Sequence, residues 1–379
     1  MPLTIVQAAA FPFPSPQGSQ VYVHGMSRAL ARRGHRVIVA CYGHGSGEVD
    51  PAIEVIRTPR LPAYDSLRAG PDLVKPFLDV ALTARLVALR AGIDVVHAHN
   101  YEAPVAAYIA RALNGVPVVY NNHNTMAEEL HRYFERPAAR RAARRIGTWL
   151  DGAVPRRADA CVAISEQAAP LLRSLGCRDV TFIPPGVDLE ELVGDRERAR
   201  AELDLGDRAW VIYAGNPDPY QDLEVLIDAV ASLDTLGLLM VSASSLGKWE
   251  SRSMSIEADR KRFVVTPSWD RVRDLLAAAD MAALPRAVCS GYPMKLLNTL
   301  GFGLPTVCAE GSARDIAGVV PVPDGDVAAF ALALASLEQD PGRRARLGAE
   351  ARADIASRFT WDQCARRLEA VYERVTKAR

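Results

Sequence analysis

The chain has 379 residues, 49% hydrophobic and 24% charged, a composition typical of soluble globular proteins and a length sufficient for two domains. Lysine plus arginine and aspartate plus glutamate both number 45, so the zero net charge excludes a chain-wide attraction to nucleic acid or anionic surfaces. Because the six cysteines lack paired spacing and no apolar run reaches 18 residues, we expect reduced thiols, no metal cluster, no spanning helix and a cytoplasmic protein.

Strand-like and helical segments alternate through the first half of the chain. Short apolar runs predict strands at residues 4–7, 37–41, 94–98, 116–121, 160–164 and 180–183. Longer segments between them predict helices, such as residues 20–33, which follow a loop containing Gly18, with Ser19 as the expected N-cap. This alternation predicts a parallel sheet covered by helices on both faces.

A second series of the same kind begins after the Pro-Pro-Gly-Val-Asp loop at residues 184–188. Its predicted strands are residues 210–214, 238–241, 262–265, 281–284, 305–308 and 319–322. We therefore expect an α/β chain of two Rossmann-like, doubly wound parallel-sheet domains, with a hinge near residues 184–192. Ligands of such sheets bind at the carboxyl ends of the strands, and candidate site residues are sought there.

Histidine chemistry belongs to the first domain, because all seven histidines precede residue 132. His123 follows a predicted strand at its carboxyl end, where a neutral imidazole offers a ligand one donor and one acceptor. The alternative is a histidine that only caps local structure. His97 and His99 lie at another strand end and share one face if the strand continues through both. We expect them to support the site.

Residues 290–307 combine a tight loop, an apolar helix over residues 294–302 and a Gly-Leu-Pro turn into a buried strand. The N-terminus of a helix carries partial positive charge and unpaired N–H groups, so this loop is a candidate anion site. Lys295 in the first turn adds a full charge. The alternative is an ordinary surface connection with a solvated lysine.

Several segments, taken together and in order, resemble glycosyltransferase family 4. They are FPSPQGSQVYVHGMSRALARRGHRV, DVVHAHN, GVPVVYNNHN, FIPPGVD, AGNPDPYQDLEVLIDA, the segment at 290–307 and the closing RFTWDQCARRLEAVYERV. The resemblance implies the GT-B fold, in which two Rossmann-like domains face each other across a cleft. It further implies an acceptor-binding domain at residues 1–185, a donor-binding domain at 186–357 and a last helix, at 358–379, that crosses back to the first domain.

The resemblance implies a donor site, but four of its usual charges are missing. An Arg and a Lys that grip the donor diphosphate correspond here to Asn216 and Gln221, and two glutamates correspond to Ser290 and Asn298. Because neutral hydrogen bonds are weaker than charge-assisted ones, the site is either weakened or rebuilt. Lys295 and Arg286 are the candidate replacements, although Arg286 could be a solvated loop residue. The predicted catalytic residues are His123 and Lys295, and the predicted donor-binding residues are Gly18, Gly215, Asn216, Gln221, Arg286, Ser290, Gly291 and Asn298.

The implied function is retaining transfer of a sugar from a nucleotide-diphosphate sugar to an acceptor hydroxyl. We expect a role in cell-envelope polysaccharide or glycolipid assembly, with a carbohydrate, lipid-linked or small-molecule acceptor. We expect no metal and no cofactor, because dipoles and cations can stabilise the leaving diphosphate, and Asp324-Gly325-Asp326 precedes a helix that it can cap. The alternatives are a natural-product glycosyltransferase, a degenerate protein that only binds a sugar nucleotide or a partner, and a phosphorylase or epimerase of the same fold.

Residues 131–160 carry eight arginines, from Arg132 to Arg157, against three acidic residues. Together with Ile146 and Trp149 they predict a basic amphipathic helix that could lie on the inner face of an anionic membrane. The alternative is a solvated arginine-rich face.

Overall fold

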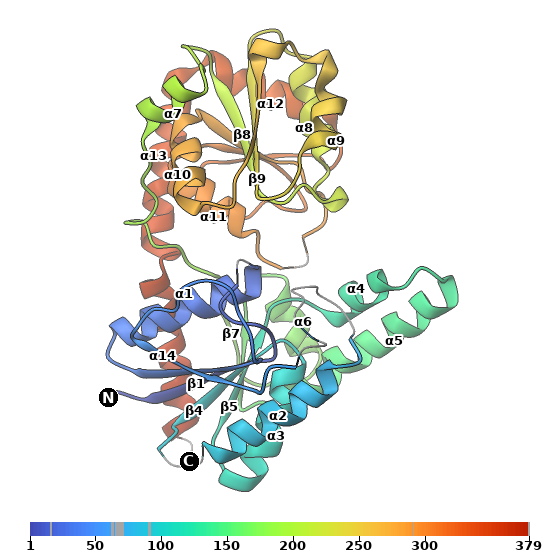
Figure 1. Cartoon of the computed structure of the whole chain (residues 1–379), viewed down its shortest axis with the longest axis vertical. Coiled ribbons are helices and arrows are strands. Elements are labelled where there is room, and N and C mark those ends of the chain that lie inside the picture. The colour runs from blue at the N-terminus through green and yellow to red at the C-terminus, as the bar shows by residue number, and fades with distance from the viewer. Residues whose placement is uncertain (16, 62–63, 65–71, 90–91, 290, 378–379) are drawn as a thin grey trace. The chain divides into compact units, whose positions relative to one another are not determined.

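The computed structural model describes residues 1–379 except 16, 62–63, 65–71, 90–91, 290 and 378–379. The chain divides into two compact units, each described here by itself (Figure 1). Unit 1 comprises Met1–Gly186, Ser290–Tyr292 and Trp361–Arg379, and unit 2 comprises Val187–Cys289 and Pro293–Thr360.

Unit 1 is built on a seven-stranded parallel sheet of order β3-β2-β1-β4-β5-β6-β7. Its strands are β1 (Thr4–Ala9), β2 (Arg36–Cys41), β3 (Ile53–Arg57), β4 (Val95–His99), β5 (Val118–Asn122), β6 (Ala160–Ala163) and β7 (Val180–Phe182). The central strands β4 and β5 are buried along their whole length, as expected for a sheet covered on both faces. The strand order reverses between β1 and β4, which is where a doubly wound sheet opens a crevice for ligands.

The helices of unit 1 are α1 (Gly18–Arg32), α2 (Lys75–Ala88), α3 (Glu102–Asn114), α4 (Met126–Glu129), α5 (Pro137–Ala153), α6 (Ala168–Ser174) and α14 (Trp361–Lys377). The last helix, α14, packs on α1, where a side chain at Gly25 would overlap the ring of Trp361. Trp361, Leu368 and Tyr372 are all buried and form the apolar face predicted for this helix.

Two local predictions for unit 1 were wrong. The strand β3 was missed, because two charged residues interrupt the apolar ones in its sequence Ile-Glu-Val-Ile-Arg, as is common in an edge strand. The expected N-cap at Ser19 is also wrong, since α1 begins at Gly18 and the extended residue before it is Gln17. Ser19 therefore lies inside the first turn.

Unit 2 carries a six-stranded parallel sheet of order β10-β9-β8-β11-β12-β13. Its strands are β8 (Trp210–Ala214), β9 (Gly237–Ser242), β10 (Lys261–Val265), β11 (Met281–Leu284), β12 (Thr306–Ala309) and β13 (Val319–Val322). Its α-helices are α7 (Arg196–Glu202), α8 (Leu223–Ala231), α9 (Gly247–Arg252), α10 (Trp269–Ala278), α11 (Met294–Gly301), α12 (Val327–Gln339) and α13 (Pro341–Arg358). The order reverses between β8 and β11. Two doubly wound parallel sheets confirm the fold class predicted from the sequence.

The acidic Asp324-Gly325-Asp326 segment has the structural role expected of it. The Asp326 side chain accepts a hydrogen bond from the backbone N–H of Ala329 at 2.9 Å and caps α12. Asp324 accepts one from the N–H of Gly311, also at 2.9 Å.

Candidate functional site

In unit 2, three polar residues from separate segments converge where the strand order reverses. Asn216 follows β8, Gln221 precedes α8, and Lys295 lies in the first turn of α11. The Lys295 ammonium donates to the amide oxygen of Asn216 at 3.0 Å, to that of Gln221 at 3.1 Å and to the hydroxyl of Tyr213 at 2.6 Å. An ammonium has three hydrogens, so these acceptors satisfy it completely. We call these four residues the lysine cluster.

The Lys295 charge is held in a desolvated position. Burial, reinforced by the nearby positive charge of Arg286, lowers the pKa of Lys295 to about 7, while the Asp218 carboxylate opposes this shift. The ammonium also lies 4.7 Å from the centre of the Tyr213 ring, a cation–π distance. Lys295 is therefore neither a freely solvated surface lysine nor a permanently charged one.

The backbone around the cluster is shaped to admit the lysine. A Cβ at Gly215 would lie within 2.4 Å of Cε and Nζ of Lys295, so a side chain at the end of β8 would displace the lysine, and the backbone φ of +156° also favours glycine there. The Arg286 guanidinium lies over the Tyr220 ring at 4.9 Å, and Tyr220 accepts a hydrogen bond from the Asn216 amide at 2.7 Å. Lys295, Asn216, Gln221, Gly215 and Arg286 thus belong to one local constellation.

The other residues predicted to bind the donor are Asn298, Gly291, Gly18 and Ser290. Asn298 is half-buried, and three residues after Lys295 it lies on the same face of α11. Gly291 groups with unit 1. A side chain at Gly18 would meet nothing within 4 Å, so nothing in the packing of the chain itself requires glycine there. Ser290 lies outside the described residues.

In unit 1, three histidines gather at the carboxyl ends of β4 and β5. His99 Nδ1 lies 3.0 Å from His123 Nε2, and His99 Nε2 lies 2.7 Å from the Gln7 amide oxygen. His97 stacks on His99 with 4.7 Å between ring centres, so the two share one face of the strand, and its Nδ1 lies 2.7 Å from the Tyr372 hydroxyl. We call these five residues the histidine cluster.

Burial keeps these imidazoles neutral. It lowers the pKa of His123 to about 3, and burial together with His123 lowers the pKa of His97 to about 3. The pKa of His99 is also far below its usual value, for the same reason and because His97 and His123 lie close by. At neutral pH His123 is thus a hydrogen-bonding group and not a cation.

Polar atoms next to His123 lack partners within the described part of the chain. They are Oδ1 of Asn124 and Oγ1 of Thr125, both buried. Such groups cost free energy unless a ligand or water satisfies them, and this favours a polar ligand at the end of β5.

Sequence reasoning missed Gln7, Tyr372 and Tyr213. Gln7 did leave a signal, because it is the one strongly polar residue in the apolar strand Thr-Ile-Val-Gln-Ala-Ala. In the sequence, Tyr213 and Tyr372 cannot be told from ordinary core aromatics. Only the fold brings the Tyr213 hydroxyl to Lys295 and the Tyr372 hydroxyl to His97.

The described residues contain no group of three or more His, Cys, Asp or Glu side chains placed to hold a metal ion. No described helix is long and apolar enough to cross a membrane.

Comparison with known proteins identifies the family. Residues 16–191 match the model of Glycosyltransferase Family 4, and residues 208–340 match that of Glycosyl transferases group 1. A D-inositol 3-phosphate glycosyltransferase of Xylanimonas cellulosilytica is 30% identical over 96% of this chain and 93% of its own length. The chain belongs to glycosyltransferase family 4.

Other relatives agree with this family. A D-inositol 3-phosphate glycosyltransferase of Stackebrandtia nassauensis is 30% identical over 94% of this chain and 86% of its own. Among solved structures, sucrose-phosphate synthase of Thermosynechococcus elongatus superimposes with a TM-score of 0.81 at 19% identity, covering 99% of this glycosyltransferase and all of the synthase. Anabaena Alr3699/HepE, solved in complex with UDP, gives a TM-score of 0.76 at 16% identity over 98% of this chain and 100% of its own. These structural matches show the fold, which is GT-B.

Proposed function

We propose that this glycosyltransferase transfers a sugar from a nucleotide-diphosphate sugar to an acceptor hydroxyl, with retention at the anomeric carbon and without a metal ion or cofactor. The observation that carries the proposal is the position of Lys295. Its ammonium lies between Asn216 and Gln221, the two positions at which the family resemblance places the diphosphate-binding cations. One lysine on α11 thus supplies positive charge where two substituted residues no longer do.

Each residue then has a defined task. Lys295 and the N–H groups at the start of α11 stabilise the charge that develops on the leaving diphosphate. Arg286 and Asn298 contribute from the adjoining loop and the same helix face. His123, neutral and at the carboxyl end of β5, hydrogen-bonds a hydroxyl of the transferred sugar, and Gly18 lines the phosphate and acceptor side. Retention follows from attack on the face the diphosphate leaves, with a diphosphate oxygen accepting the acceptor's proton, so no carboxylate base is needed.

The relatives suggest which substrates to try first. The Anabaena protein has been solved with UDP-glucose, and the sequence relatives are named for D-inositol 3-phosphate. A phosphorylated cyclitol therefore joins the lipid-linked and polysaccharide acceptors expected for cell-envelope assembly.

A thermal-shift panel tests the donor proposal directly. We expect one nucleoside diphosphate, or its sugar, to raise Tm, because a ligand that binds only the folded state stabilises it by mass action. The same panel on Lys295→Ala controls for non-specific binding, since this variant should lose the shift. A parent protein that responds to none of the nucleotides contradicts the proposal.

We also propose peripheral contact with an anionic membrane through residues 132–157. In Figure 1 the pair α4 and α5 projects from the rest of unit 1, and along α5 only Ala143, Gly147 and Asp151 are buried. The exposed surface of α5 combines four arginines with Ile146 and Trp149, which are 53% and 67% exposed. Cations for lipid phosphates beside apolar side chains for the acyl boundary are typical of an interfacial helix.

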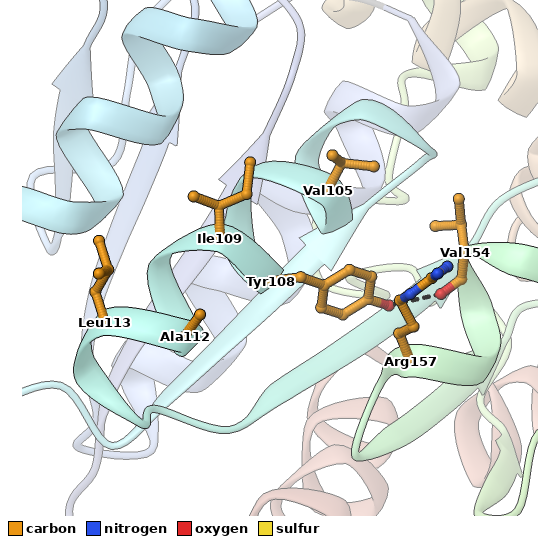
Figure 2. Close-up of a pocket in the computed structure, with 7 residues that line it drawn as sticks. All are labelled: Val105, Tyr108, Ile109, Ala112, Leu113, Val154 and Arg157. Carbon is orange, nitrogen blue, oxygen red and sulfur yellow. Dashed lines mark hydrogen bonds between the residues drawn. The ribbon is translucent and has the colours of Figure 1, made fainter.

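The neighbouring α3 extends this surface. Val105, Ile109 and Leu113 recur every four residues and are 47%, 50% and 61% exposed. Together with Val154 and Arg157 they line an apolar groove of about 450 Å³. Figure 2 shows these side chains. The Tyr108 hydroxyl in this groove already donates to the Val154 carbonyl at 2.8 Å, so the groove suits an apolar occupant such as lipid chains.

Vesicle flotation tests the membrane proposal. The parent should float with vesicles containing phosphatidylglycerol and much less with pure phosphatidylcholine. The variant Ile146→Ser, Trp149→Ser should weaken binding roughly tenfold or more, because each change removes an exposed apolar side chain from the acyl boundary. Leu332→Ser is the control, because Leu332 is a leucine of unit 2 that is 73% exposed. Equal binding by all three proteins would contradict the proposal.

A further inference from the structure

The histidine cluster contains a directed chain of hydrogen bonds that begins at Gln7. This residue is fully buried in the middle of β1. Its amide oxygen faces His99 Nε2 at 2.7 Å, and its amide nitrogen faces the Tyr372 hydroxyl at 3.5 Å. Tyr372 comes from α14, so the last helix helps to hold the amide in this orientation.

The amide oxygen determines where the hydrogens of both imidazoles lie. An amide oxygen can only accept, so His99 Nε2 must carry the hydrogen and donate it. A neutral imidazole has one N–H, which leaves His99 Nδ1 as an acceptor. His123 Nε2, 3.0 Å from that nitrogen, must then be the donor, and the remaining nitrogen of His123, Nδ1, is a bare acceptor. This assignment of hydrogens requires that both rings are neutral, and burial keeps them so.

We propose that Gln7 and His99 are positioning residues that hold His123 in the Nε2–H tautomer, so that its Nδ1 accepts a hydrogen bond from the ligand. This inference rests on the proposed function, in which His123 faces the transferred sugar. It narrows the ligand, because the group that faces His123 must donate a hydrogen. A sugar with a free hydroxyl there fits, and one with an ether, a carboxylate or fluorine at that position does not.

The tautomer is directly observable in the protein without ligand. In a long-range ¹H–¹⁵N spectrum of the ¹⁵N-labelled full chain, a protonated and a bare imidazole nitrogen resonate far apart. The His123 signals are assigned as those missing from His123→Asn. We expect a protonated Nε2 and a bare Nδ1. A protonated Nδ1 in the parent overturns the proposal.

Substitution of Gln7 tests whether its amide oxygen determines the tautomer of His123. In Gln7→Leu, a hydrogen on His99 Nε2 would point at a methyl group, so His99 should place its hydrogen on Nδ1 and force His123 to protonate Nδ1 instead. We expect this switch together with a fall in kcat of roughly tenfold and a smaller change in KM. Gln20→Leu is the matched control, because Gln20 is also a buried amide of unit 1 but bonds to Gln17. It should leave the His123 signals in place, and unchanged His123 signals in Gln7→Leu overturn the proposal.

Two further experiments replace Gln7→Leu if that variant does not fold and test the contact with the ligand separately. If Gln7→Leu does not fold, Gln7→Met removes the same amide while keeping the side-chain length; the appearance of Nδ1-protonated His123 in that variant supports the chain, and its absence overturns it. Turnover of a series of donors, each with one sugar hydroxyl replaced by fluorine, tests the ligand. If the spectra behave as expected and every fluorinated donor reacts normally, the tautomer assignment stands and the sugar contact of His123 is refuted.

Discussion

The lysine cluster of unit 2 and the histidine cluster of unit 1 are built alike but carry opposite electrostatics. Each lies where a doubly wound sheet reverses its strand order, and each joins a ring or ammonium to amide and tyrosine side chains. Burial lowers the pKa in both clusters, but that of His123 falls to about 3, so the ring is neutral at pH 7, whereas that of Lys295 falls only to about 7, so the amine is partly charged there. This contrast fits the proposed roles of the two clusters, in which neutral groups orient the sugar and one cation stabilises the leaving diphosphate.

This arrangement differs from a donor site with several permanent charges. An arginine stays protonated at any accessible pH and binds phosphate with two parallel hydrogen bonds, whereas a lysine is a point charge whose pKa shifts readily. In the proposed donor site the charge is concentrated on Lys295, and we therefore expect donor binding to depend on this single side chain and on pH.

The largest effect is expected for Lys295→Ala. Removing the ammonium should lower kcat/KM roughly 100-fold, because a preorganised desolvated charge beside the leaving group is hard to replace. Lys377→Ala is the control, since Lys377 is an exposed lysine that pairs with Glu373 on the surface of α14. Steady-state kinetics at saturating acceptor provide the measurement. Parent-like kinetics in Lys295→Ala would show that this residue does not act on the donor. The contrast between the two clusters would then have no functional meaning.

A somewhat smaller loss is expected when the missing cations are put back. Asn216 and Gln221 now accept hydrogen bonds from the Lys295 ammonium, so Asn216→Arg with Gln221→Lys would replace two acceptors by two positive charges. Two unit charges about 4 Å apart repel by about 4 kcal/mol at an effective dielectric constant of 20, enough to displace or deprotonate Lys295. We therefore expect activity to fall roughly tenfold or more. Titration calorimetry and turnover of the double variant and the parent provide the measurement. Tighter nucleotide binding and higher activity in the double variant would show that the parent site is weakened and not rebuilt.

On the histidine side, His123→Ala should lower turnover roughly tenfold and shift Tm by only a few degrees. The imidazole makes one ring–ring hydrogen bond, to His99, and lies at the strand end next to polar atoms that have no partner among the described residues. Turnover and a melting curve on the same preparation separate the two roles. A large drop in Tm with normal specific activity would make His123 structural.

The sequence predicted the architecture and part of each cluster, and the reasons differ by residue. Parallel strands buried on both faces leave near-continuous apolar runs, which is why twelve strands were found and only the charged edge strand β3 was missed. Gly215 was found from the family resemblance and Lys295 from its place in the first turn of a predicted helix, but their steric fit depends on the packing of α11 beside β8. The roles of Gln7, Tyr213 and Tyr372 could not be predicted, because their hydroxyl and amide groups meet their partners only through contacts that span up to 365 residues of the chain.

The smallest effect, and the most specific to the lysine cluster, is its pH dependence. The pKa of Lys295 is lowered to about 7 in the folded protein, whereas an unfolded chain keeps the ordinary value near 10.4. Between these values the unfolded state binds more protons, so the contribution of this residue to stability rises with pH above 7. Relative to Lys295→Met, the ligand-free parent should gain about 2 °C in Tm between pH 7 and 9. Nucleotide binding should change in the opposite direction and weaken over the same interval, because the diphosphate requires the ammonium. Calorimetric melting and nucleotide titration at matched pH values test both signs, and parallel pH profiles for parent and variant would contradict a titrating lysine in the site.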